Sequence, residues 1–346
     1  MPTDLRLLMA EPARRSCVRS LALAALVSAA CGSGSPTTPT ATQQELRLES
    51  TLRGQTVSAS DTGVLGGVTV QLGIRTPTAS DANGYFSVNH DAAGASLIEL
   101  SGPAIVPRQT TVQLPSSGMV TFGLIPATFD LSAFDEMFRG SQARLQRWMV
   151  APSLVVLTSV MQFENSEASF SKSTGEEIPS DEVAMLVRDL TQALADLSAN
   201  SFSPVRVSLE RTAAGMYAST VRDGQIVIGR FKDLKALDRV IGYGRCAERD
   251  GVVTAGSVAL DALFDTTSER RRLLRTHELG HALGYKHVTL RQSIMNPSLG
   301  SDITDFDRQG AAIAFQRPPG NHAPDTDPLP AIRAAGGTAR WSAPIE

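Results

Sequence analysis

Five residues between positions 277 and 287 have the types and the spacing that metal-assisted hydrolysis requires. The stretch reads H-E-x-x-H-x-x-G-x-x-H, and its fixed positions are His277, Glu278, His281, Gly284 and His287. Residues four apart lie on one face of a helix, so His277 and His281 can direct two imidazoles at a single ion. Gly284 can end that helix in the left-handed conformation, which lets the chain turn back and bring in His287 as a third ligand.

Three neutral imidazoles with an open fourth position are typical of a catalytic zinc site, because structural zinc fills all four positions, usually with cysteines. The chain contains only three cysteines, too few for a closed site of that kind. We therefore expect zinc at His277, His281 and His287. Glu278 would flank the metal without binding it and act as the general base that takes a proton from an attacking water.

A second short motif follows, because residues 293–297 read S-I-M-N-P and place Met295 eight residues after His287. An extended zinc motif with a methionine turn close behind it resembles the metzincin metalloproteases. Met-x-Pro is similar to the matrixin-like branch, whereas the astacin and serralysin branches carry a tyrosine where this chain has Pro297. The resemblance covers the segment from Trp148 to Phe315 and implies that Met295 forms a hydrophobic floor beneath the three histidines.

This resemblance implies a zinc-dependent endopeptidase that acts on protein or peptide substrates. In matrixin-like enzymes an extended substrate pairs with the strand before the active-site helix, for which this sequence offers Gly256 to Leu260. Matrixins also bind a second, structural zinc through further histidines and aspartates, but only His90 and His322 lie outside the motif here. We therefore expect one zinc ion. Calcium sites stay open, although the sequence contains neither an EF-hand-like loop nor a glycine-rich nonapeptide.

The elements that must position the motif can be predicted from hydrophobic periodicity. Residues 180–198 have helical spacing with the first residue as N-cap, and a later helix runs from Thr304 through Phe315. The active-site helix is expected to begin at Thr266, because Thr266-x-x-Glu269 is a capping box. Strands are expected at 148–152, 154–157, 205–209, 225–228 and 256–260. This order of strands and helices matches the upper half of a metzincin domain.

An all-β region is expected before this segment. Residues 45–128 contain short apolar alternations separated by turn residues, with a strand at 68–72, turn residues at 81–84 and a further strand from Tyr85. The pattern is typical of a β-sandwich and resembles the carboxypeptidase regulatory-like domain. We therefore expect a multidomain chain, in which an all-β sandwich precedes an α+β metzincin-type zinc protease domain at residues 129–316.

Residues 1–30 resemble a bacterial export signal. Arginines precede the apolar run 21–27, which is too short to span a bilayer. Cys31 follows small residues, as in a lipoprotein signal that is cut before a lipid-modified cysteine, and the lipid would tether the protein to a membrane. Ser28 departs from the usual leucine of such signals, so cleavage near Ala30 as an ordinary secretory signal stays open. Both interpretations export the protein.

The remaining regions carry less chemistry. Residues 31–44 read as a flexible linker of Ser, Thr, Pro and Gly, and residues 317–346 as a tail rich in Pro, Gly and Ala that contains His322. Cys246 is expected to be a buried structural cysteine, and His90 a surface or strand histidine. The composition, 42% hydrophobic and 19% charged, is that of a globular protein, and a formal charge of −3 gives no indication of nucleic-acid binding.

Two other functions stay open. In a cell-surface binding protein, the β-sandwich would recognise a partner and the zinc domain would be inactive. Glu278 argues against this interpretation, because an inactive domain has no chemical need for the base. Residues 46–128 could instead form an inhibitory prosegment, but they contain no cysteine that could block the zinc.

Overall fold

The computed structural model describes residues 50–91, 93–329 and 340–341. The expected signal and linker, residues 1–44, and with them Cys31, lie outside these ranges. Within the described residues the chain is a mixed α/β structure with two small sheets, one large mixed sheet and six helices. No helix in these ranges combines the length and the apolar character needed to cross a membrane.

The two small sheets occupy residues 50–124. Their strands are β1 (Ser50–Ser58), β2 (Thr69–Leu72), β3 (Thr78–Ala79), β4 (Tyr85–His90), β5 (Gly94–Ser101), β6 (Arg108–Leu114) and β7 (Val120–Leu124). The first sheet has the order β4-β1-β7 and the second the order β3-β2-β5-β6. Side chains of β4 alternate strictly between exposed and buried, and the inward residues of both sheets form one hydrophobic cluster. The strands predicted near residues 68–72 and 85–88 are confirmed.

The turn before β4 has the chemistry that its sequence indicates. The carboxylate of Asp81 accepts hydrogen bonds from the backbone N–H groups of Asn83 at 2.9 Å and Tyr85 at 2.8 Å. Gly84 has a φ of 75°, which residues with a side chain rarely adopt. His90 is buried at the end of β4, so it is a strand histidine.

The large sheet mixes parallel and antiparallel pairs. Its strands are β8 (Arg147–Trp148), β9 (Ser153–Leu157), β10 (Ser159–Gln162), β11 (Phe170–Glu177), β12 (Val207–Glu210), β13 (Tyr217–Ser219), β14 (Gln225–Lys232), β15 (Gly242–Arg249), β16 (Val252–Asp261) and β17 (Arg340–Trp341). The main order is β13-β11-β10-β14-β16-β15-β17, while β9 pairs with β14 and β12, and β8 pairs with β16. The central strands β9, β14 and β16 are parallel to one another. These strands are mostly apolar and buried, as expected for strands covered on both faces.

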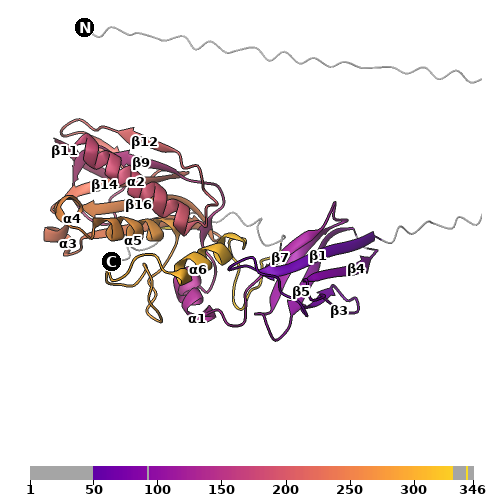
Figure 1. Ribbon diagram of the computed structural model, residues 1–346. Helices are drawn as coiled ribbons and strands as arrows, with labels where there is room; N and C mark the ends of the chain where they lie inside the picture. Colours follow the sequence, from indigo (N-terminus) through magenta and orange to yellow (C-terminus); the bar gives the residue numbers. More distant parts are fainter. Residues whose placement is uncertain (1–49, 92, 330–339, 342–346) are drawn as a thin grey trace, which may run out of the picture. The chain divides into compact units, whose positions relative to one another are not determined.

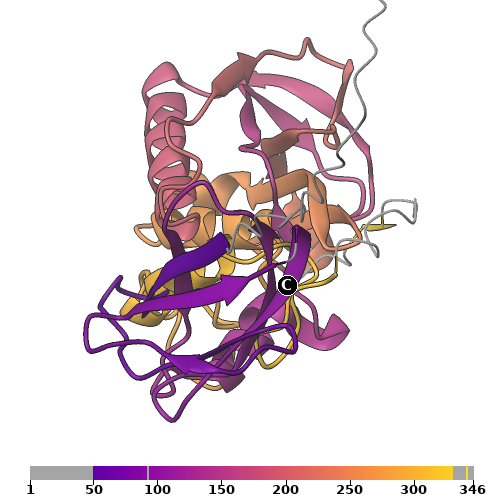
Figure 2. The same cartoon turned by 90° about the vertical axis from the view of Figure 1, so that its right-hand side faces the viewer.

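The six helices are α1 (Leu131–Phe134), α2 (Ser180–Leu197), α3 (Leu234–Asp238), α4 (Ala262–Thr267), α5 (Arg271–Leu283) and α6 (Asp305–Phe315). The long helix predicted at residues 180–198 is confirmed as α2, although Pro179 rather than Ser180 precedes its first turn. Thr304 caps α6, as its sequence indicated. The helices α2 and α5 lie on the same face of the large sheet (Figure 1, Figure 2).

The large sheet has a hydrophobic cluster on each face. Leu154 of β9 belongs to the cluster that includes side chains of α2 and α5, whereas its neighbour Val155 belongs to the cluster on the opposite face. This alternation follows from the two-residue period of a strand. Cys246 of β15 is fully buried in the first cluster, as predicted.

The helix that carries the zinc motif begins later than its sequence indicated, and the expected capping box at Thr266 is wrong. Thr266 lies inside α4, where its hydroxyl donates to the carbonyl of Ala262 at 2.7 Å. The side chain of Asp261 caps α4 instead, by accepting a hydrogen bond from a backbone N–H of the first turn. The chain is extended at Ser268, and α5 starts at Arg271.

A buried ion-pair network fixes the first half of α5. The carboxylate of Asp265 accepts hydrogen bonds from Nε of Arg230 at 2.6 Å and from Nε of Arg275 at 2.7 Å. Arg275 also pairs with Asp189 of α2 at 2.6 Å, and Arg230 pairs with Glu182 of the same helix at 2.9 Å. Charges taken out of water need such partners, so the network holds α5 against α2 and β14.

The segment that the sequence indicated as the start of a tail is packed between residues 317 and 329. Arg317 and Asp325 are buried, and the carboxylate of Asp325 accepts hydrogen bonds from Arg317 at 2.7 Å and from Arg108 of β6 at 2.8 Å. Burial raises the pKa of Asp325, but the two arginines outweigh it and lower that pKa overall. Hydrophobic periodicity does not reveal this packing, because charged side chains carry it.

Replacing Asp265 by alanine should lower the free energy of unfolding by about 3–5 kcal/mol, because two buried guanidinium groups would lose a shared counter-charge. Urea unfolding followed by circular dichroism measures this change. The matched control is Glu164→Ala, which removes an exposed carboxylate and should change stability by no more than about 0.5 kcal/mol. Equal unfolding midpoints for the two variants would contradict the role given to Asp265.

Candidate metal centre

Three imidazole nitrogens converge at the C-terminal half of α5. The Nε2 atoms of His277 and His281 lie 3.1 Å apart, and Nε2 of His287 lies 3.2 Å from each of them. They form the one group of three potential ligands found among the described residues. The structure therefore brings together all three histidines of the motif, while His90 in β4 and the exposed His322 take no part in the group.

Gly284 makes the convergence of these histidines possible. It follows the last residue of α5 with a φ of 108°, in the left-handed region. Its N–H donates to the carbonyl of His281 at 3.0 Å, and the N–H of Tyr285 donates to the carbonyl of Gly280 at 3.0 Å. The chain then returns along the helix, so His287 faces the two helical histidines.

Hydrogen bonds to backbone carbonyls set the tautomers of the two helical histidines. Nδ1 of His277 donates to the carbonyl of Ile294 at 2.7 Å, and Nδ1 of His281 donates to the carbonyl of Tyr285 at 2.9 Å. A carbonyl can only accept, so each Nε2 carries a lone pair and no proton when the ring is neutral. Two such lone pairs 3.1 Å apart repel each other unless a cation lies between them.

The donor set fits a zinc ion. Nitrogen ligands bind zinc at about 2.0–2.1 Å in tetrahedral geometry, which separates them by about 3.3 Å, close to the 3.1–3.2 Å found here. Burial lowers the pKa of His277 to about 4 and that of His281 well below its usual value, and it also lowers the pKa of the half-buried His287. Neutral imidazoles at physiological pH are the form that binds metal.

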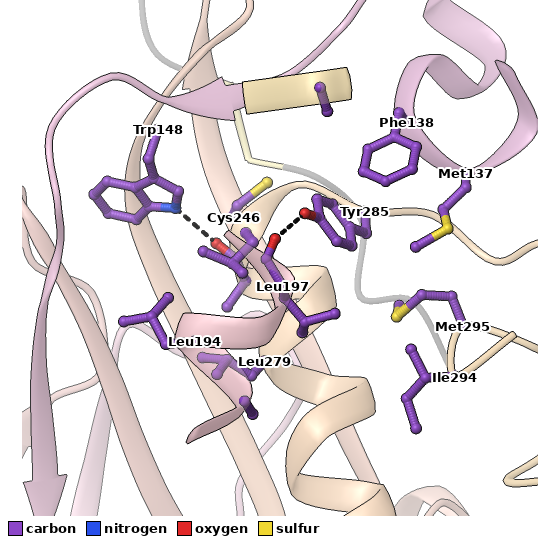
Figure 3. Close-up of a cluster of buried hydrophobic side chains, with 14 of the residues drawn as sticks. Met137, Phe138, Trp148, Leu194, Leu197, Cys246, Leu279, Tyr285, Ile294 and Met295 are labelled. Carbon is purple, nitrogen blue, oxygen red and sulfur yellow. Dashed lines mark hydrogen bonds between the residues drawn. The ribbon is translucent and has the colours of Figure 1, made fainter. Parts of the chain in front are cut away.

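Met295 is fully buried and lies against α5 at Gly280. A β-carbon at Gly280 would lie 2.5 Å from the Met295 sulfur, so the helix and the methionine can approach this closely only because residue 280 is glycine. Figure 3 shows Met295 in the buried cluster with Ile294, Met137 and Tyr285. The methionine therefore packs against the helix that carries two of the three histidines.

An aspartate of α6 orients the segment that binds His277. Asp307 is fully buried and accepts hydrogen bonds from the hydroxyl of Ser293 and from the N–H of Ile294, the latter at 3.1 Å. The carbonyl of Ile294 in turn accepts the Nδ1 proton of His277. Such partners of ligating histidines fix the ring orientation and contribute to metal affinity. The sequence indicated the helix at Asp307 but not this role.

Two further hydrogen bonds secure the end of α5 within the core, and Figure 3 draws both. The indole N–H of Trp148 donates to the carbonyl of Ala282 at 3.0 Å, and the hydroxyl of Tyr285 donates to the carbonyl of Leu197 in α2. All four residues belong to the same hydrophobic cluster. The turn that returns His287 is therefore anchored to both α2 and β8.

Glu278 lies on α5 next to the histidines and is 3% exposed. Burial raises the pKa of Glu278 well above its usual value, and a hydrogen bond with the backbone of Gly244 opposes that rise. Its Oε2 atom has no hydrogen-bond partner among the described protein atoms. A buried carboxylate with one free oxygen next to a metal centre is suited to accept a proton.

Glycines of β15 allow α5 to lie against the sheet. A β-carbon at Gly244 would lie 2.0 Å from the carbonyl oxygen of Glu278 and 2.7 Å from Cβ of His281, and one at Gly242 would lie 3.1 Å from Oε1 of Glu278. Contacts under 3 Å with backbone atoms force the elements apart. The importance of Gly242 and Gly244 was not predicted, although two glycines two residues apart on a strand lie on the same face and can indicate a close contact there.

The strand expected to bind substrate is corrected. Residues Gly256 to Leu260 lie in β16, which pairs with β14 on one side and with β15 on the other, so no edge of this stretch is open. The outer neighbour β15 pairs with β17 only at Ala247 and Glu248. Among the described residues, no second strand pairs with β15 at Gly242 to Gly244.

Comparison with known proteins matched the chain to no family model and to no curated protein. What the site can do is therefore argued from its own residues. The structure contains a three-histidine group on and beside a helix, consistent with an H-E-x-x-H…H zinc site.

The variant Gly244→Ala should lower the free energy of unfolding by about 1–3 kcal/mol and reduce zinc content, because the new methyl group overlaps the backbone of α5. Chemical unfolding and metal analysis measure the two effects. Gly118→Ala is the matched control, since a β-carbon there meets no atom within 4 Å, and it should change stability by less than about 1 kcal/mol. If both variants keep wild-type stability, the close contact between α5 and β15 is not a requirement of the fold.

Proposed function

We propose that this protein is an exported zinc endopeptidase whose catalytic segment, residues 129–316, is of the matrixin-like metzincin kind. One observation carries the proposal: three histidine Nε2 atoms meet within 3.2 Å, and the buried carboxylate of Glu278 lies on the same helix. A structural zinc site would need a fourth protein ligand. Among the described residues, no cysteine, carboxylate or fourth histidine joins the group.

In this proposal the histidines bind the metal and Glu278 transfers the proton. His277, His281 and His287 would hold the ion, with Met295 beneath them. When bound, zinc supplies Lewis-acid chemistry that acidifies water and polarises a peptide carbonyl. Glu278 takes the proton of the attacking water and passes it to the leaving amine. Its burial supports this role, because a carboxylate with a raised pKa is a stronger base than an exposed one.

The substrate would be an extended stretch of protein or peptide. The side of β15 that faces away from β16 at Gly242 to Gly244 supports this proposal, because no described strand pairs with it there and such an edge can add a strand through backbone hydrogen bonds. Gly242 lies beside Glu278, so a chain paired along this edge would pass the general base. Backbone pairing depends little on sequence, so side-chain preference would come from pockets near the metal.

The rest of the chain would serve export and tethering. We propose that residues 45–128 form a carboxypeptidase regulatory-like sandwich, supported by two sheets that share one core. Export, and anchoring through a lipid on Cys31 or else release as a secreted protein, rest on the sequence pattern of residues 1–31. No feature of charge or composition suggests a nucleic-acid partner.

Hydrolysis of an unfolded protein and of a quenched-peptide library by the purified chain tests the proposal. The wild type should contain one zinc per chain, lose activity on treatment with a chelator and regain it when zinc is added back. Glu278→Gln should lower the rate about 10²- to 10⁴-fold, because it removes the general base, while its zinc content stays the same. Glu269→Gln, an exposed change on the loop before α5, should keep full activity.

Other outcomes would decide between the alternatives. A folded chain without zinc would refute the site itself. Zinc with no hydrolysis, and with no difference between wild type and Glu278→Gln in any assay, would favour a surface binding protein with an inactive metal domain.

A further inference from the structure

The third ligand is held differently from the other two. His277 and His281 lie on α5 and donate their Nδ1 protons to backbone carbonyls, whereas His287 lies in the loop after the helix and is half-buried. Within the described residues, Nδ1 of His287 has no hydrogen bond that could orient its ring. Its position must therefore come from the loop that carries it.

That loop is bound on both sides of His287 by a segment about 150 residues earlier in the chain. The carboxylate of Glu136 accepts hydrogen bonds from the N–H of Thr289 at 2.9 Å, the hydroxyl of Thr289 at 2.7 Å and the N–H of Leu290 at 3.2 Å. Directly before the ligand, the N–H of Lys286 donates to the carbonyl of Met137 at 2.8 Å. Two consecutive residues, Glu136 and Met137, thus accept four hydrogen bonds that hold the loop.

The residues that follow Glu136 are packed in the core. Glu136 lies in the helical turn Asp135–Arg139 that follows α1, and its neighbours Met137 and Phe138 are almost completely buried. The ring of Phe138 lies 4.5 Å from the ring of Tyr285 between their centroids. The hydrogen bonds of Glu136 therefore connect the loop to a backbone segment that is anchored in the hydrophobic core.

The carboxylate is also kept in its charged form. Burial acts to raise the pKa of Glu136, but the hydrogen bonds from Thr289 and Leu290 outweigh it and lower the pKa overall. Hydrogen bonds to an ionised acceptor are shorter and about twice as strong as those between neutral groups. A neutral amide at the same position would be a weaker substitute.

We propose that Glu136 is the positioning residue of the third metal ligand. By binding residues 289 and 290 it fixes the loop that places Nε2 of His287 3.2 Å from the other two ligand atoms. Glu136 is not one of the potential metal ligands among the described residues, so it would act through His287. The inference rests on the proposed zinc site and adds to it a residue that the zinc motif does not contain.

Zinc affinity of the full chain, measured by competition with a chromophoric chelator, tests the role directly. Glu136→Ala should bind zinc about 10- to 100-fold more weakly than the wild type, the usual loss when an indirect partner of a ligand is removed. Its cobalt-loaded form should show an altered visible spectrum, because the ligand geometry changes. The control Glu164→Ala removes an exposed carboxylate and should match the wild type in both measurements.

A substitution of Thr289, which donates to Glu136, gives a second variant with a smaller expected effect on zinc binding. Thr289→Val keeps the shape of the side chain but removes the hydroxyl that donates to Glu136, so it should weaken zinc binding by a smaller factor. In the double variant with Glu136→Ala, the threonine change should add almost nothing, because its acceptor is already gone. Independent, multiplying losses would overturn the proposed contact.

The remaining outcomes are also decisive. Wild-type zinc affinity in folded Glu136→Ala, or in Thr289→Val if the first variant does not fold, would overturn the inference. So would an equal loss of stability in the zinc-free and zinc-bound forms, because that result means a purely structural role. A wild type that binds zinc but hydrolyses no peptide would refute the proposed peptidase while leaving the role of Glu136 in metal binding supported.

Discussion

The metal centre depends first on how closely α5 lies against β15. The carbonyl of Glu278 occupies space that a β-carbon on Gly244 would need, and on the next strand a β-carbon at Gly256 would lie 3.1 Å from the carbonyl oxygen of Ala282. These close contacts therefore restrict both the distance of α5 from the sheet and the rotation of α5 about its own axis. Because His277, Glu278 and His281 share this helix, the packing of α5 against the sheet sets the positions of all three residues.

Orientation of the ligands comes from elsewhere, and from a different source for each. His277 is oriented by the carbonyl of Ile294, which Asp307 holds in place, and His281 by the carbonyl of Tyr285 just beyond the helix. His287 depends on the loop bound to Glu136. Rings oriented in this way are already arranged for a metal, so binding requires little loss of side-chain freedom.

Much of the site could be predicted from the sequence, because its ligands, the terminating Gly284 and Met295 lie within one short stretch with fixed local geometry. The long helix α2 and the central strands were also predictable, since their periodicity is local. The beginning of α5 was not, because Thr266 lies inside the separate short helix α4, which Asp261 caps and which ends before the extended residue Ser268. The open edge of β15 and the role of Glu136 depend on pairing between distant segments, which periodicity does not contain.

The zinc motif and the residue that orients its first histidine are also synthesised at different times. Asp307 lies thirty residues beyond His277 in the sequence, so a ribosome has already completed the whole zinc motif before it adds the carboxylate that orients the first ligand. A nascent chain that ends before Asp307 thus contains all three histidines but lacks the carboxylate that holds Ile294 in place. The site can therefore assemble only after α6 has folded against Ser293 and Ile294.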